Sequence, residues 1–310
     1  MSESSLYNKP SPDLEADREK RRAAVTSVIA AIGLTLLKIA AGIATGSLGI
    51  LAEAAHSGLD LAAAVITYVA IRIAVRPADS GHNYGHGKVE NLSALFETLL
   101  LLATCGWIMY EAINRLFFRS IEVEASIWAF GVMVISIMVD WSRSRVLKRA
   151  AKAHRSQALE ADALHFSTDI WSSAVVILGL ACVKAAEYFP GYTFLSHADA
   201  AAAIIVAMIV AYVSIRLAIR AVQALIDAAP RGHYRLIKET AEGIPGVINC
   251  HQIRFRSSGP KLFIDIHIMT DGTQTLAQAH EITDNVERAI QDVVPNADVT
   301  VHPEPDSGKS

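Results

Sequence analysis

Long apolar stretches recur through the first two thirds of the chain, and they restrict its fold more than any other feature. A helix needs roughly 20 consecutive apolar residues to cross the hydrocarbon core of a bilayer. Six stretches approach or exceed that length, at about residues 23–45, 48–75, 92–117, 125–141, 159–186 and 198–218. Of the 310 residues, 52% are hydrophobic and 19% are charged, a composition that excludes an ordinary soluble domain. We therefore expect an all-α transmembrane domain of six helices, embedded in a lipid bilayer and covering residues 23–226.

The charged residues between these stretches predict how the helices are oriented. Basic residues concentrate in an N-terminal arm of residues 1–22, in the link that contains Arg72, Arg76 and Lys88, and in residues 143–155. Because Lys and Arg in short loops favour the cytoplasmic side, we expect a cytosolic arm and both termini in the cytoplasm. The arm lacks the short apolar core of a cleavable signal peptide. We interpret the basic run at 143–155 as a topology signal and expect no nucleic-acid partner.

The pattern changes at Asp227, where a second domain begins. Residues 234–242 and 275–293 have helical spacing, whereas residues 247–256, 262–269 and 297–301 alternate or run apolar as short strands do. A turn at residues 257–260 joins the first two strands. We expect a small cytosolic α+β domain, in the order α-β-β-α-β, over residues 227–303, followed by a tail at 304–310.

Two His-x-x-x-Asp pairs lie at the start of apolar stretches, His56 with Asp60 and His165 with Asp169. Residues four apart share one face of a helix. A carboxylate inside a membrane costs about 2.5–3.5 kcal/mol on insertion scales, so it indicates function by default. One pair alone could be a structural hydrogen bond. Two imidazoles and two carboxylates together form a complete tetrahedral set for Zn²⁺, and four protein ligands favour holding and releasing an ion over hydrolysis.

Two further sets of metal-ligand side chains lie outside the apolar stretches. Asp79, His82 and His86 fall within eight residues of a glycine-punctuated link, which is either a metal site or a solvated polar loop. In the C-terminal domain, the two hairpin strands and the last strand carry histidines that can converge at one edge. We expect this third metal site to draw on His251, His267, His280, His302 and Glu304.

Other polar residues in or near the apolar stretches have weaker signals. Asp162 lies one helical turn before His165, where it would line an ion entrance or sit at the membrane interface. We interpret Glu97 as an ordinary helix-face residue. The chain has 3 cysteines, spaced without a C-x-x-C motif, which suggests neither a disulfide framework nor a thiolate zinc site.

The motifs together resemble the cation diffusion facilitators, a family of proton-coupled exporters of divalent metals. The resemblance covers nearly the whole chain and rests on H-S-G-L-D, P-A-D-S-G-H-N-Y-G-H-G-K-V-E-N, A-D-A-L-H-F-S-T-D, R-S-S-G-P and F-I-D-I-H. It implies six spans, a metallochaperone-like C-terminal domain, a homodimer and the three metal sites named above. Some members have an aspartate where this chain has Glu304. The resemblance also implies a charge interlock between Lys88 and Asp227 at the dimer seam.

These observations lead to a functional hypothesis with two rivals. We expect a transporter, not an enzyme, that exports Zn²⁺ by proton antiport and alternating access, with Fe²⁺, Cd²⁺ and Co²⁺ as alternative cargo. The short loops fit a bacterial inner membrane. The first rival is a membrane metalloenzyme, which lacks a placed general base near the two pairs. The second is a membrane-anchored metal sensor, in which only the C-terminal domain binds metal.

Overall fold

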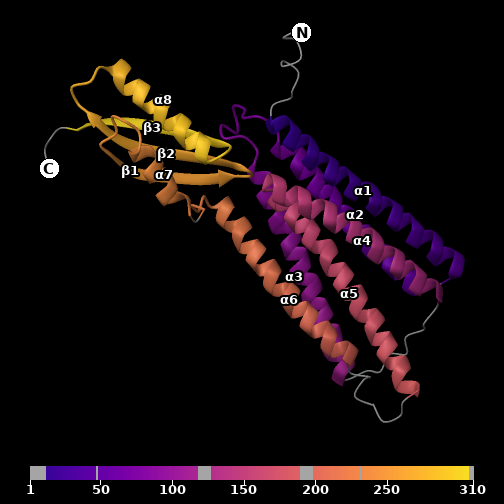
Figure 1. Cartoon of the computed structure of the whole chain (residues 1–310). Helices are drawn as coiled ribbons and strands as arrows, with labels where there is room; N and C mark the ends of the chain where they lie inside the picture. Colours follow the sequence, from indigo (N-terminus) through magenta and orange to yellow (C-terminus); the bar gives the residue numbers. More distant parts are fainter. Residues whose placement is uncertain (1–11, 47, 118–126, 189–197, 231, 307–310) are drawn as a thin grey trace, which may run out of the picture. The chain divides into compact units, whose positions relative to one another are not determined.

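The computed structural model describes residues 12–46, 48–117, 127–188, 198–230 and 232–306 (Figure 1). It divides into two compact units. The first contains Met1–Arg76 and Val89–Val222, and the second contains Pro77–Lys88 and Gln223–Ser310. The link that carries Asp79, His82 and His86 therefore belongs to the same unit as the C-terminal domain.

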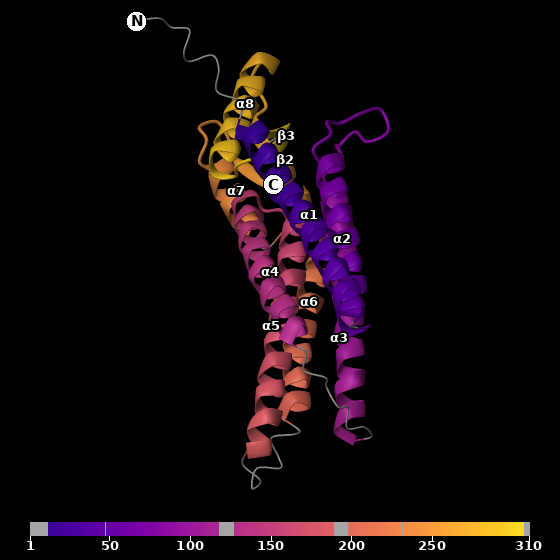
Figure 2. The ribbon, with the colours of Figure 1, turned by 90° about the vertical axis from the view of Figure 1, so that its right-hand side faces the viewer.

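The first unit consists of long helices running alongside one another (Figures 1 and 2). In chain order they are α1 (Pro12–Thr45), α2 (Leu48–Ala74), α3 (Lys88–Phe117), α4 (Ile127–His154), α5 (Gln157–Tyr188) and α6 (Ala198–Leu225). α1 already begins at Pro12, so the second half of the expected arm continues the first apolar helix. Lys20 explains part of this extension, because its ammonium is buried and bonds Glu90 of α3 at 3.0 Å.

Four stretches of these helices are long and apolar enough to cross a membrane, judged over the described residues. They are Glu15–Thr45, Glu53–Ala74, Lys88–Asn114 and Ile204–Leu225. α4 carries several charges in its second half and α5 carries several polar residues in its first half, which lowers their mean hydropathy. That α4 and α5 also span the bilayer remains a prediction.

Small side chains let α1, α2, α4 and α5 pack closely into a bundle. The buried cluster between them consists mostly of alanines around Ile71, Leu147 and Phe166. Large apolar side chains such as Ile29, Leu36 and Ile43 of α1 point outward and are exposed. Small residues inside and large apolar residues outside are typical of helices packed together within lipid. A second cluster joins α3, α5 and α6 through Ala94, Ala161, Leu217 and Ala221.

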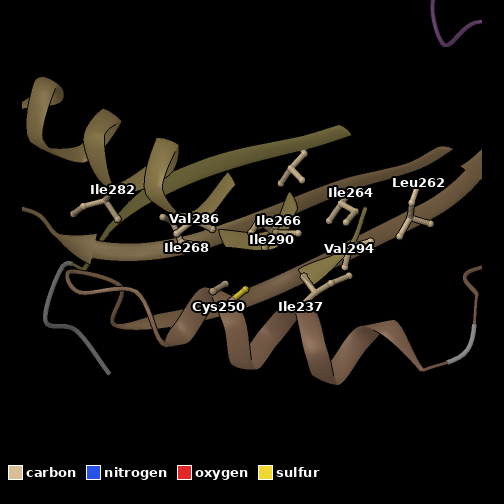
Figure 3. Close-up of a cluster of buried hydrophobic side chains, with 12 residues drawn as sticks. Ile237, Cys250, Leu262, Ile264, Ile266, Ile268, Ile282, Val286, Ile290 and Val294 are labelled. Atoms are coloured by element: carbon tan, nitrogen blue, oxygen red, sulfur yellow. The ribbon is translucent and has the colours of Figure 1, made fainter. Parts of the chain in front are cut away.

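The C-terminal domain has the predicted order α7 (His233–Glu242), β1 (Asn249–Ser258), β2 (Lys261–Asp271), α8 (Leu276–Val293) and β3 (Ala297–Asp306). β2 is central, antiparallel to β1 and parallel to β3. Alternate β2 residues face a core completed by Ile237 of α7 and by Ile282, Val286 and Ile290 of α8 (Figure 3). β3 continues to Asp306, beyond the expected strand end at Val301, because its pairing with β2 continues as far as Asp271.

The fold class is therefore confirmed as a helical transmembrane domain followed by a small α+β domain. Both helices of the C-terminal domain cover one face of the sheet. The opposite face of β2 presents Asp265, His267 and Met269, which are partly or fully exposed. This open face is where the polar side chains of the domain gather.

Candidate metal centres

The two His-Asp pairs lie on α2 and α5, and these helices bring them together. His165 Nε2 lies 3.1 Å from Asp60 Oδ1 and 3.7 Å from Asp169 Oδ2. His56 Nε2 lies 3.8 Å from Asp60 Oδ1 and 4.0 Å from Asp169 Oδ1. Each pair sits on one helix face, as the spacing predicts, and each histidine also meets the aspartate of the other helix.

The separations fit a four-coordinate metal. Bonds of 2.0–2.2 Å at tetrahedral angles place neighbouring ligand atoms about 3.4 Å apart. The four nitrogen-to-oxygen distances of this group range from 3.1 to 4.0 Å. His56, Asp60 and Asp169 each offer a ligand atom within 4.8 Å of the other two, and His165 Nε2 lies within 3.7 Å of both aspartates. Asp60 and His165 are buried, whereas His56 is partly exposed.

A polar contact between α1 and α2 steadies the helix turn of His56. Lys38 Nζ donates to Ser57 Oγ at 2.8 Å and pairs with Glu53 at 3.1 Å. Thr35 Oγ donates to the Ser57 carbonyl at 3.0 Å. This support was missed from the sequence, although Lys38 is the charged residue that interrupts the first apolar stretch.

A second set of polar contacts joins α5 to α1 and α4. The guanidinium of Arg143 lies 3.5 Å from the centre of the Phe166 ring, which itself meets the His165 ring edge-on. Arg143 also donates to Ser27 and pairs with Asp140 at 3.3 Å. The basic run at residues 143–155 indicates a topology signal in the sequence, yet its first residue, Arg143, is buried inside the bundle.

The loop set forms a second compact group. Asp79 Oδ1 lies 3.2 Å from His82 Nδ1, and Asp79 Oδ2 lies 3.4 Å from His86 Nε2. The two imidazole rings are 4.3 Å apart. The backbone N–H groups of His82 and Gly81 donate to Asp79 and hold the pKa of its carboxyl below the usual range. The carboxylate is therefore charged and available to a cation at neutral pH.

The loop is fixed to the C-terminal domain within the second unit. The Tyr84 ring meets Phe263 edge-on at 5.1 Å, and the Arg256 guanidinium lies 4.0 Å from the Tyr84 ring centre. A side chain at Gly87 would collide with the Ser258 carbonyl oxygen, 2.4 Å from the position of its Cβ. Glycine is therefore required where the loop meets the β1–β2 hairpin.

The third group lies on the open face of the sheet, where three histidines align across the strands. His251, His267 and His302 occupy paired positions on β1, β2 and β3. Glu304 stands beside them, 2.7 Å from His267, 3.2 Å from His251 and 3.9 Å from His302. The hydrogen bond with His267 lowers the pKa of the Glu304 carboxyl, and the nearby imidazoles lower it further.

His280 is the one candidate ligand of this domain that the structure does not bring to the others. It lies on α8 with its side chain 74% exposed, 3.9 Å from Asp284. The reason is that α8 covers the opposite face of the sheet from the three histidines. Sequence spacing alone could not separate the two faces.

Lys88 and Asp227 do meet, at 2.8 Å, within a single chain. Asp227 also pairs with Arg256 at 3.3 Å, a partner that the sequence did not suggest. Lys88 and Arg256 hold the pKa of Asp227 below its ordinary value, chiefly through the hydrogen bond from Lys88. Arg256 thus contacts both Asp227 and the ring of Tyr84, which connects the loop to the start of the C-terminal domain.

Comparisons with known proteins agree with this architecture. Residues 24–226 match the model of the cation efflux transmembrane domain, and residues 229–306 match that of the cation efflux protein cytoplasmic domain. A cation-efflux pump FieF from Pectobacterium atrosepticum is 30% identical over 290 residues, covering 91% of this chain and 92% of the relative. A FieF pump from Salmonella newport is 31% identical over 285 residues, covering 92% of both chains.

A solved structure named MamM-CTD 215-293 is 32% identical and covers 23% of this chain and 92% of its own, with a TM-score of 0.23. The two family matches together cover most of the chain, over residues 24–226 and 229–306. The chain therefore belongs to the cation efflux family, the cation diffusion facilitators, whose members are membrane transporters of divalent metals and not enzymes.

Proposed function

We propose that this chain exports Zn²⁺ in exchange for protons and that His56, Asp60, His165 and Asp169 hold the ion during transport. The observation that carries the proposal is the meeting of these four side chains between α2 and α5, with nitrogen-to-oxygen distances of 3.1–4.0 Å. Two nitrogen and two oxygen donors suit Zn²⁺, whereas an all-oxygen set would favour Mn²⁺ or Mg²⁺. Fe²⁺, Co²⁺ and Cd²⁺ are the competing cargo.

Proton exchange follows from the chemistry of these ligands. A metal ion binds neutral imidazole and ionised carboxylate, so each ion that enters displaces the protons that these groups carry. Alternating access would open the site first to the cytosol and then to the other side of the membrane. Protons that return to the ligands from that side would then release the ion.

The other two groups have supporting roles in this proposal. Asp79, His82 and His86 form a loop metal site, and His251, His267, His302 and Glu304 form a cytosolic regulatory site, with His280 as a further candidate ligand. The chain acts as a homodimer, with both termini in the cytoplasm of a bacterial inner membrane. The match to the cytoplasmic domain of cation efflux proteins and the bacterial relatives support this arrangement.

Metal flux into proteoliposomes tests the proposal directly. Purified parent protein and Asp169→Ala are reconstituted with an imposed pH gradient, and uptake of Zn²⁺, Fe²⁺, Co²⁺, Cd²⁺ and Mn²⁺ is measured. We expect the parent to move Zn²⁺ best, and Asp169→Ala to fall to the level of protein-free vesicles. Asp298→Asn, which alters an exposed carboxylate paired with Lys261, is the control and should match the parent.

Two outcomes would contradict the proposal. Asp169→Ala could move Zn²⁺ at the parent rate, which would exclude the four-ligand group as the transport site. Alternatively, the parent rate could be independent of the pH gradient, which would exclude proton exchange while leaving metal efflux intact.

A further inference from the structure

A groove between α1 and α4 lies outside all three candidate metal centres. Two hollows, of about 270 and about 380 Å³, adjoin each other there, because Ala23, Thr26 and Val146 line both of them. Thr26 and Val146 are exposed, so the groove opens on the surface of the bundle. A surface groove between helices that cross a membrane is filled by lipid or by another protein.

One end of the groove is mostly apolar. The smaller hollow extends along Ala30, Val139 and Leu147. Arg143 also lines this hollow, but its guanidinium is buried and already pairs with Asp140 at 3.3 Å. This end therefore suits an apolar chain better than an anion.

The other end of the groove has two arginines that are free to bind a ligand. Arg22 of α1 and Arg149 of α4 both line the larger hollow, and both are exposed. Neither has an ion-pair partner among the described residues. Glu19 lines the same hollow, but its carboxylate lies 2.8 Å from His154 Nε2 and so has a partner of its own. Two guanidinium groups that line one hollow favour an anion, and phosphate oxygens suit their geometry.

The arginine end of the groove lies where the surface of the bundle changes from charged to apolar. On α1, Arg21 before Arg22 is exposed and charged, whereas Val25 after it is exposed and apolar. On α4, Trp141 is exposed, and the Arg145 guanidinium lies 5.1 Å from the centre of its ring. Tryptophan concentrates at the interface between membrane and water. The groove therefore extends from the level of the lipid headgroups toward that of the acyl chains.

We propose that this groove binds one anionic phospholipid, whose phosphate contacts Arg22 and Arg149 and whose acyl chain lies along the apolar end. Charge complementarity selects this occupant. A zwitterionic lipid brings an ammonium group toward the two guanidinium groups, whereas an anionic lipid brings only negative charge. Basic pockets between transmembrane helices on the cytoplasmic side bind lipid headgroups in this way. The bound lipid joins α1 to α4, and the site does not depend on the proposed transport function.

Native mass spectrometry of the full chain in a neutral detergent tests the proposal. The protein is titrated with dioleoylphosphatidylglycerol, which is anionic, or with dioleoylphosphatidylcholine, which is zwitterionic. We expect one phosphatidylglycerol per chain to bind saturably, and phosphatidylcholine to bind more weakly. The double variant Arg22→Gln with Arg149→Gln should lower the affinity for phosphatidylglycerol by about 5-fold per arginine. The matched control, Arg21→Gln with Lys148→Gln, removes the same charge from exposed neighbours that do not line the groove, and it should bind like the parent.

Two further variants test the shape of the groove and the role of charge separately. Thr26→Phe fills the groove without removing a charge and should also weaken phosphatidylglycerol binding. Arg22→Lys with Arg149→Lys keeps both charges and should retain most of the binding that the glutamine variant loses. Phosphatidylglycerol should raise the unfolding temperature of the parent, because it binds only the folded chain. The same measurement without lipid establishes that each variant is folded.

Four outcomes would overturn the proposal. Equal losses in the glutamine variant and its control would indicate general surface charge, and equal binding of the two lipids would show that the headgroup charge is not recognised. Inorganic phosphate that raises the unfolding temperature as much as phosphatidylglycerol would identify a free anion as the ligand. A change from dimer to monomer in the mass spectrum of the glutamine variant would identify the groove as a subunit interface.

Discussion

Asp227 shows how one residue can connect several segments of the second unit. It follows α6, pairs with Lys88 at the start of α3, and pairs with Arg256 on β1. Its backbone is left-handed, with φ at 61°, a conformation that Asp and Asn tolerate better than other side chains with a Cβ. Asp227→Asn therefore removes the charge without adding backbone strain.

The pH dependence of this residue follows from its lowered pKa. Since the folded-state pKa lies below that of the unfolded chain, the ion pairs stabilise the fold at pH above about 4. This contribution is lost as the pH falls through the folded-state pKa. We expect Asp227→Asn to unfold at a lower temperature than the parent at pH 7. The free energy of unfolding should fall by less than about 1 kcal/mol, because the ion pair is partly exposed.

Thermal unfolding of the full chain in detergent at several pH values measures the effect. The difference between Asp227→Asn and the parent should shrink in acid, whereas Asp298→Asn should show no such trend. A difference that stays constant down to pH values well below the ordinary range of aspartate would show that the charge of Asp227 does not stabilise the fold.

At the scale of single residues, the sequence predicted most of the candidate ligands that the structure brings together but few of the contacts around them. The four-residue spacing places His56 and Asp60 on one face of α2, and His165 and Asp169 on one face of α5. The structure shows both arrangements. The supporting contact of Arg143 depends on which helices are neighbours. The spacing within one helix contains no information about that choice, so the partner Ser27 could not be foreseen.

At the scale of elements, the loop at residues 77–88 is held against the hairpin by close packing. Gly87 approaches the backbone of Ser258 too closely for any side chain, whereas Gly81 has only Asp79 Oδ1 nearby, at 3.5 Å. The loop therefore has no room for an added side chain at Gly87 but has room for one at Gly81. Gly81→Ala is the matched control for Gly87→Ala.

We expect Gly87→Ala to detach the loop from the hairpin. Forced overpacking costs about 1–3 kcal/mol, equivalent to about 5- to 150-fold faster amide exchange in a segment that must open. Hydrogen–deuterium exchange of the full chain should show this acceleration in peptides covering residues 81–88. Gly81→Ala should exchange like the parent, and equal exchange in both variants would contradict the proposed close approach.

Element boundaries were less predictable than element order. The α-β-β-α-β order follows from the change in periodicity after Asp227, and the structure confirms it. The length of β3 could not be inferred, because Pro303 and Pro305 interrupt its pattern while the pairing to β2 continues. Proline is tolerated at a sheet edge, where its missing N–H needs no ladder partner.

At the scale of the whole molecule, candidate metal ligands are divided between the two units. The first unit contains the candidate ligands of α2 and α5, and the second contains both the loop group at residues 79–86 and the C-terminal group on the sheet. A metal that binds only the folded domain stabilises it by mass action. Metal binding to the C-terminal group should therefore be visible as stability, independently of transport.

Glu304→Gln tests the C-terminal group in these terms. The parent should unfold at higher temperature with Zn²⁺ than after treatment with a chelator, and Glu304→Gln should lose most of this gain, with metal affinity lower by about 10-fold or more. The amide cannot provide the charged oxygens that face His251 and His267. Asp298→Asn is the matched control, and a full gain in Glu304→Gln would remove Glu304 from the site.

Whether α2 and α5 hold one ion between them is measured most directly by the zinc-edge X-ray absorption spectrum of the full chain carrying His82→Ala, His251→Ala and His267→Ala. We expect a four-coordinate shell of two imidazole nitrogens and two carboxylate oxygens at about 2.0–2.2 Å, and the loss of one imidazole in His165→Ala. A shell without imidazole, or a spectrum that His165→Ala leaves unchanged, would contradict the claim that α2 and α5 hold one ion between them.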